Sequence, residues 1–215
     1  MRTTKPAFTL VELLLGAVVT SLIGLSVVTV GGALTSRYDK SETYYQSVQA
    51  ARSSLSKVQA QFHAAQLVTQ VSPSQITLWG DAGGDGQINP GELVVLTYSG
   101  GTIRQYHVVY PGGLSEALKA VLDAPISLST AVEQPNTLAS QLASALYGTS
   151  KVLASDVTAF SVSADVPPPM TRIVTLSVTT GTGPDAVTVR SVAALRGDKT
   201  GSVAWVNGHY ALAGS

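Results

Sequence analysis

A run of apolar residues at positions 10–34 constrains this chain more than any other feature. Glu12 is the only ionisable residue in the run. At 1.5 Å per residue, a helix of roughly 25 residues crosses the hydrocarbon core of a bilayer, which is about 30 Å thick. The run therefore predicts a transmembrane helix. Arg2 and Lys5 precede it, and the positive-inside tendency then holds the N-terminus in the cytoplasm and sends the remainder across.

A cleaved secretory signal peptide is the alternative interpretation of this N-terminus. Signal peptides have an apolar core of only ~7–15 residues, which a small-residue cleavage site follows. Here Gly31-Gly32-Ala33 continues into a second helical pattern with no break in period. A helix that stays in the membrane is therefore the favoured interpretation.

The residues at the start of the run resemble a known processing site. The stretch Pro6-Ala7-Phe8-Thr9-Leu10-Val11-Glu12-Leu13-Leu14 is similar to the cleavage motif of type IV prepilins and type II secretion pseudopilins. The resemblance implies that residues 1–7 are a basic leader, and that a prepilin peptidase cuts between Ala7 and Phe8 and methylates the new amino group of Phe8. Glu12 matches the glutamate that follows the cut. The family usually has Gly at the position that Ala7 holds.

The resemblance also implies a partner for the charge of Glu12. Cleavage would create a cationic amine at Phe8, and helical geometry places Glu12 four residues along on the same face. The carboxylate could then neutralise that amine or the amine of a neighbouring subunit. An unpaired carboxylate at membrane depth costs on the order of 2.5–3.5 kcal/mol, which favours a packed bundle in which the pair forms. The alternative is a glutamate that reaches the headgroups from the end of the span.

Beyond the apolar run, an amphipathic pattern extends the helix over residues 35–68. Val48, Leu55, Val58, Phe62 and Ala65 recur at helical spacings and define one apolar face. We expect one long helix over residues 8–68, with the transmembrane part at about 10–34. The apolar face is expected to pack against a globular domain.

Residues 69–215 are predicted to form a β-rich head, so that the fold class is α+β. Short β-rich runs separated by turns indicate antiparallel sheets. The predicted strands cover residues 75–79, 93–99, 102–109, 152–164, 172–180 and 185–194, and the predicted short helices cover 114–122 and 137–147. The last three strands resemble those of minor pseudopilins of the J or W type, which implies a pilin-like fold.

The stretch DAGGDGQINPGE, from Asp81 to Glu92, nearly matches the twelve-residue loop that binds Ca²⁺ in EF-hands and dockerins. The predicted ligands are Asp81, Asp85, the Gln87 carbonyl, Asn89 and Glu92. Gly83 stands where a third oxygen-bearing side chain is expected, so the affinity should be weak, at ~10⁻⁴–10⁻³ M. A structural Ca²⁺ that staples a hairpin is one interpretation. A Gly-rich turn whose Asp and Asn side chains cap their own backbone is the other.

Composition and motifs argue against several classes of function. Thirteen Lys plus Arg balance thirteen Asp plus Glu, so no net charge gathers nucleic acid. The chain has no cysteine, which excludes disulfides and thiolate metal sites. Its three histidines are widely separated, and the sequence contains neither a GxSxG motif nor a Walker loop. An enzyme is therefore not predicted.

Together these features predict a minor pseudopilin or minor pilin subunit. It would sit in the bacterial inner membrane with one span, place its head in the periplasm or outside the cell, and assemble into a filament for type II secretion or a type IV pilus. The implied partners are other pilins or pseudopilins, the prepilin peptidase, the inner-membrane assembly platform and membrane lipid. The alternative is a single-pass anchored binding domain that does not polymerise.

Overall fold

A computed structural model describes residues 9–133, 147–195, 197, 199–206 and 208–213 of the chain. The chain divides into two compact units, Met1–Tyr45 and Gln46–Ser215. Each unit is described by itself below. The predicted helix at 137–147 lies almost entirely outside the described residues.

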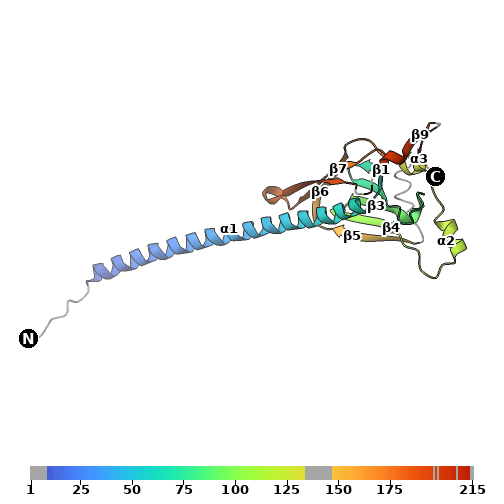
Figure 1. The fold of residues 1–215 in the computed structure, drawn as a ribbon. Coiled ribbons are helices and arrows are strands. Elements are labelled where there is room, and N and C mark those ends of the chain that lie inside the picture. The colour runs from blue at the N-terminus through green and yellow to red at the C-terminus, as the bar shows by residue number, and fades with distance from the viewer. Residues whose placement is uncertain (1–8, 134–146, 196, 198, 207, 214–215) are drawn as a thin grey trace, which may run out of the picture. The chain divides into compact units, whose positions relative to one another are not determined.

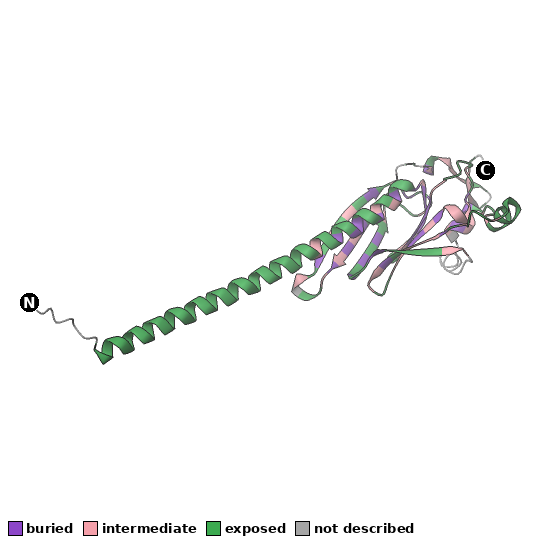
Figure 2. Ribbon diagram, turned by 90° about the horizontal axis from the view of Figure 1, so that it is seen from below, coloured by how far each residue is buried: buried purple, intermediate pink, exposed green. Residues whose placement is uncertain are grey.

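A single helix, α1 (Leu10–Ala64), contributes to both units (Figure 1). It is 55 residues long, and its N-terminal part is exposed along its whole length in Figure 2. The helix was predicted to end near Val68 and instead ends four residues earlier, at Ala64. Residues 67–72 form a strand instead, because the Gln66 N–H donates to the Trp79 carbonyl at 2.8 Å and starts a hairpin there.

The second unit is α+β, as expected, and its described strands all pair antiparallel. A five-stranded sheet has the order β1-β2-β3-β4-β5, a three-stranded sheet the order β6-β7-β8, and β9 and β10 form a hairpin. The strands of the first sheet are β1 (Leu67–Ser72), β2 (Gln75–Trp79), β3 (Leu93–Ser99), β4 (Thr102–Val108) and β5 (Gly148–Ala154). The remaining strands are β6 (Val157–Ala164), β7 (Ile173–Thr180), β8 (Val187–Ala194), β9 (Val203–Val206) and β10 (His209–Leu212).

The structure corrects several predicted elements. The single strand expected at 152–164 is two strands in two different sheets, separated by a turn in which Asp156 has a φ of 58°. The helix expected at 114–122 is shorter, as α2 (Glu116–Leu122). One helix and three strands were not anticipated, namely α3 (Leu128–Glu133), β1, β9 and β10.

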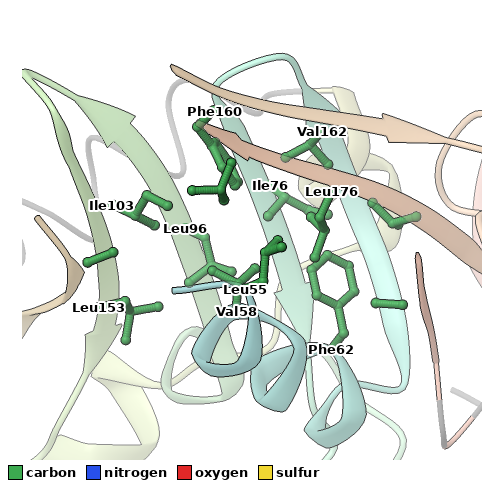
Figure 3. Close-up of a cluster of buried hydrophobic side chains, with 14 of the residues drawn as sticks. Leu55, Val58, Phe62, Ile76, Leu96, Ile103, Leu153, Phe160, Val162 and Leu176 are labelled. Atoms are coloured by element: carbon green, nitrogen blue, oxygen red, sulfur yellow. The ribbon is translucent and has the colours of Figure 1, made fainter. Parts of the chain in front are cut away.

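The C-terminal part of α1 packs against the two larger sheets of its unit. Leu55, Val58 and Phe62 from the helix meet Ile76 and Leu96 of the first sheet, and the second sheet adds Phe160, Val162 and Leu176 to the same cluster (Figure 3). The predicted apolar face is therefore confirmed for Leu55, Val58 and Phe62, which are buried. Ala65 is buried just beyond the end of the helix, and Val48 is only half-buried.

A second apolar cluster supports the connection between β2 and β3. Trp79 ends β2, Leu93 begins β3, and Ile88 lies in the connection between them; all three are buried in one cluster with Leu67 and Val95. Trp79 and Leu93 are also paired across the two strands. The β2–β3 connection is thus anchored at both ends and once in its middle.

Candidate functional site

The start of α1 is closed by a capping box between Thr9 and Glu12. Thr9 donates both its backbone N–H and its hydroxyl to Glu12 Oε2, each at 2.9 Å. In return, the Glu12 N–H lies 3.3 Å from Thr9 Oγ1. This reciprocal pattern satisfies backbone donors that a helix start otherwise leaves without partners. The Thr-x-x-Glu spacing of a capping box is present in the sequence, so this contact could have been predicted from it.

Ala7 and Phe8 lie outside the described residues. The predicted pairing of Glu12 with the amine of Phe8 therefore stays a prediction. The capping box shows that Glu12 has a local role that needs no second subunit.

The apolar part of α1 keeps its polar atoms satisfied within the helix. Thr20 donates its hydroxyl to the Gly16 carbonyl at 2.7 Å, and Ser21 donates to the Ala17 carbonyl at 2.8 Å. Ser26, Thr29 and Thr35 make the same kind of bond to the preceding turn. Such internal bonds are what a hydrocarbon environment requires, because lipid offers no hydrogen-bond partner. This helix is long and apolar enough to span a membrane.

Three predicted ligand residues of the acidic loop lie close together. The loop is the β2–β3 connection, and it ends in the short 3₁₀ helix η1 (Pro90–Glu92). One carboxylate oxygen each from Asp81, Asp85 and Glu92 can be chosen so that all three lie within 4.8 Å of one another. These residues hold the first, fifth and twelfth places of the twelve-residue pattern. The structure thus brings together the three acidic residues of the five predicted ligands.

Backbone N–H groups orient the three carboxylates. Gly86 N donates to Asp81 Oδ1 at 3.1 Å, and Gln87 N donates to Asp85 Oδ1 at 2.9 Å. Gly86 has a φ of 71°, a conformation that favours glycine, as expected at the sharp turn. These contacts are also those of the alternative interpretation, a turn in which Asp side chains cap their own backbone.

Glu92 is fixed by two hydrogen bonds across the loop. Its Oε1 accepts from Gly83 N at 2.6 Å, and its Oε2 accepts from the Trp79 indole N–H at 3.1 Å. A Cβ on Gly83 would lie 3.3 Å from Glu92 Oε1. The backbone N–H of Gly83 therefore binds Glu92 closely. In the sequence pattern, Gly83 was only the position at which a ligand side chain is missing.

Lys199 places a positive charge beside the acidic loop. Its ammonium group forms an ion pair with Asp81 Oδ2, and it lies 5.4 Å from the centroid of the Trp79 ring. The Asp81 side chain is 4% exposed and that of Lys199 is 33% exposed. The hydrogen bond from Lys199 lowers the pKa of the Asp81 carboxyl, against the opposing effect of burial. Sequence reasoning missed Lys199, since nothing in the sequence links it to a loop 118 residues away.

The two remaining predicted ligands, Asn89 and Gln87, differ in how far their side chains are buried. Asn89 Oδ1 is buried and has no hydrogen-bond partner among the described residues, which is unusual for a buried carbonyl oxygen. The Gln87 side chain is exposed. Ile88 between them is held in place, because its carbonyl accepts from Ile126 N at 2.9 Å.

The end of the loop is attached to the C-terminus of α2. Asp123 Oδ1 accepts from Gly91 N at 2.7 Å and lies 3.3 Å from the Tyr110 hydroxyl. The same hydroxyl donates to the Leu122 carbonyl at 3.1 Å. Burial, followed by the nearby Asp123 carboxylate, raises the pKa of Tyr110 to about 12. These anchoring contacts were also not predicted from the sequence.

Comparisons with protein-family models, with curated proteins and with solved structures find no match to this chain. The features that bear on its function are a membrane-compatible helix that begins in a capping box, and an α+β unit with an acidic loop.

Proposed function

We propose that the chain is a minor pseudopilin or minor pilin subunit, which a prepilin peptidase processes and which assembles through its N-terminal helix. One observation carries the proposal. In a single continuous helix, the N-terminal part leaves its large apolar side chains exposed, whereas the C-terminal part buries Leu55, Val58 and Phe62 in the core of the second unit. The exposed part needs an apolar environment, which lipid or the helices of other subunits can provide.

Glu12 has a defined place in this mechanism. The capping box uses Glu12 Oε2, and it involves only Thr9, which remains in the chain after a cut between Ala7 and Phe8. Glu12 Oε1 is then available to accept a hydrogen bond from the cationic amine of Phe8, in the same subunit or a neighbouring one. Pairing with the amine of a neighbouring subunit removes the cost of an isolated charge at membrane depth, so that pair favours assembly over the separated subunit.

We further propose that the acidic loop binds a structural Ca²⁺. The donors fit an oxygen-seeking divalent cation, because three carboxylates converge and the buried Asn89 Oδ1 is without a hydrogen bond in the described chain. Asp81, Asp85, Asn89 and Glu92 would hold the ion, with the Gln87 carbonyl. The ion would supply positive charge between β2 and β3 and so stiffen their connection.

Mass spectrometry of the mature N-terminus tests the filament proposal. The chain is expressed with a prepilin peptidase, and the expected product begins at a methylated Phe8. Ala7→Gly, which restores the usual family residue, should be cleaved at least as completely. A mature protein that retains residues 1–7 while it functions normally would overturn the proposal.

Glu12→Val tests the assembly step separately from processing. We expect cleavage to stay intact and incorporation into sheared filaments to fall strongly. Asp39→Asn is the matched control, since it removes a carboxylate from an exposed position further along the same helix. Equal recovery of Glu12→Val and the control in filaments would remove the assembly role of Glu12.

The alternative, an anchored domain that never polymerises, predicts a different result in both assays. The peptidase would leave the chain intact, and the protein would remain in the membrane fraction when filaments are sheared and pelleted.

A further inference from the structure

The tyrosines of the first unit lie in one short stretch of α1, just beyond the apolar run. The chain has eight tyrosines. Those of the second unit all pack against its two apolar clusters, namely Tyr98, Tyr106, Tyr110, Tyr147 and Tyr210. The others stay exposed, at 73% for Tyr38, 50% for Tyr44 and 64% for Tyr45. Exposed tyrosines that follow an apolar span are typical of the boundary between membrane and water, where the ring contacts apolar groups and the hydroxyl contacts water.

Helical spacing puts these tyrosines and the neighbouring cations on one side of α1. Residues 37–45 are helical, and all of them are exposed. At about 100° per residue, six of their side chains fall within an arc of about 160°. This aromatic–basic face consists of Arg37, Tyr38, Lys40, Ser41, Tyr44 and Tyr45. The acidic residues Asp39 and Glu42 lie on the opposite side, together with Thr43.

A face on one side of the helix indicates that α1 meets the membrane surface at an angle. A helix along the membrane normal would be anchored all round its circumference, whereas a tilted helix turns one side toward the headgroups. Residues 10–34 are about 37 Å long at about 1.5 Å per residue, and the hydrocarbon core is about 30 Å thick. A tilt of about 37° removes this mismatch and lies within the range of roughly 0–40° found for transmembrane helices.

This tilt brings the aromatic–basic face to the headgroups. Ser41, near the middle of the face, lies about 10 Å beyond Leu34 along the axis, and therefore about 8 Å above the hydrocarbon core at this tilt. The headgroup layer is about 5–8 Å thick. Helical side chains lean toward the N-terminus of their helix, so the long side chains of Lys40, Tyr44 and Tyr45 reach back into that layer.

We infer that α1 crosses the membrane tilted, with the aromatic–basic face against the phospholipid headgroups. Arg37 and Lys40 bind the phosphates, and the tyrosine rings lie where the headgroups meet the acyl chains. Charge complementarity identifies this occupant, because the face carries both local cations, while Asp39 and Glu42 lie on the side turned away from the phosphates. The inference rests on the membrane insertion of α1 that the proposed function requires, but not on processing or filament assembly.

Nitroxide labels on single cysteines test the inference in vesicles of phosphatidylethanolamine and phosphatidylglycerol that contain only the full chain. The chain has no cysteine of its own, so each label has one position. Ser41→Cys places the label on the aromatic–basic face, and Thr43→Cys places it on the opposite side, only about 3 Å further along the axis. Collision rates are measured with oxygen, which concentrates in lipid, and with a water-soluble nickel chelate. We expect the ratio of oxygen to nickel collisions to be several-fold higher for Ser41→Cys.

Further substitutions in the labelled Ser41→Cys chain test which side chains hold the face down. Arg37→Gln combined with Tyr45→Ser removes one cation and one aromatic ring, and should lower the collision ratio toward that of Thr43→Cys. Asp39→Asn is the matched control, since it changes a charge on the opposite side of the same helical turn and should leave the ratio unchanged. Equal ratios in the double variant and the control would overturn the role of the aromatic–basic face.

A label at Leu22→Cys separates the inference from the proposed function. If this label collides mainly with oxygen while Ser41→Cys and Thr43→Cys give equal ratios, α1 is inserted and the inference is wrong. If the Leu22→Cys label is open to the nickel chelate, α1 is not inserted, and the inference and the filament proposal are both wrong. A difference between Ser41→Cys and Thr43→Cys that appears only after other pilin subunits are added would show that the face binds protein instead of lipid, and the inference would be overturned.

Discussion

Phe62→Ala is the substitution that most directly tests the packing of α1 into the second unit. The Phe62 side chain is 0% exposed and lies between the helix and the strands that carry Ile76 and Leu176 (Figure 3). Truncation of a buried Phe to Ala removes its transfer free energy and leaves a cavity, which together cost about 3–5 kcal/mol. Domains of this kind have unfolding free energies of only about 5–15 kcal/mol, so the loss is a large fraction of the total.

Urea unfolding of the full chain in detergent, followed by Trp79 fluorescence, measures this loss. Trp205→Phe serves as the background, so that the signal comes only from Trp79, which is fully buried in the second cluster. Tyr45→Ala is the control, because that side chain is 64% exposed and its loss should change the unfolding free energy by less than about 0.5 kcal/mol. A loss under about 1 kcal/mol for Phe62→Ala would refute the view that this face of α1 supports the core.

Three further predictions concern single groups. The hydrogen bond from Lys199 lowers the pKa of Asp81, so the ion pair should stabilise the fold above about pH 3.8 and be lost as the pH falls below that value. The free energy of unfolding should therefore fall more steeply with decreasing pH in the unmodified protein than in Asp81→Asn. The pKa of Tyr110 is raised to about 12, so its contribution to the free energy of unfolding is complete below about pH 10 and is lost between about pH 10 and 12. Tyr110→Phe should remove this part of the alkaline unfolding curve, followed by circular dichroism. Thr9→Val removes the capping hydroxyl and should lower the local stability of the start of α1 by about 1 kcal/mol, measured by amide hydrogen exchange. Thr9→Ser keeps a hydroxyl and should leave this stability unchanged.

Local patterns predicted the helix and the strands that flank the acidic loop. Apolar periodicity located α1 and its buried face, since both depend on spacing within one element. The end of α1 was missed because Leu67 and Val68 fit the helical pattern as well as a strand, and only pairing with β2 decides between them. In the same way, residues 152–164 read as one strand, although a turn at Asp156 sends the two halves to different sheets.

The acidic loop was located from its own residues, but its contacts were not. Asp81, Asp85 and Glu92 lie within one connection, and their convergence follows from a short loop between paired strands. Lys199 and Asp123 reach the loop from distant segments, and their positions depend on how β9 and α2 pack. A single sequence contains no signal for such long-range pairs.

The internal hydrogen bonds of Ser and Thr along the first part of α1 affect how this segment tolerates a change of surroundings. Each hydroxyl is already occupied by a carbonyl of its own helix, so transfer from hydrocarbon tails to the side chains of neighbouring helices neither breaks nor creates a polar contact. Beyond Glu12, contacts between such helices then depend on the fit of their side chains, and a new Asn or Gln on this surface would add hydrogen bonds between helices that the natural segment does not make.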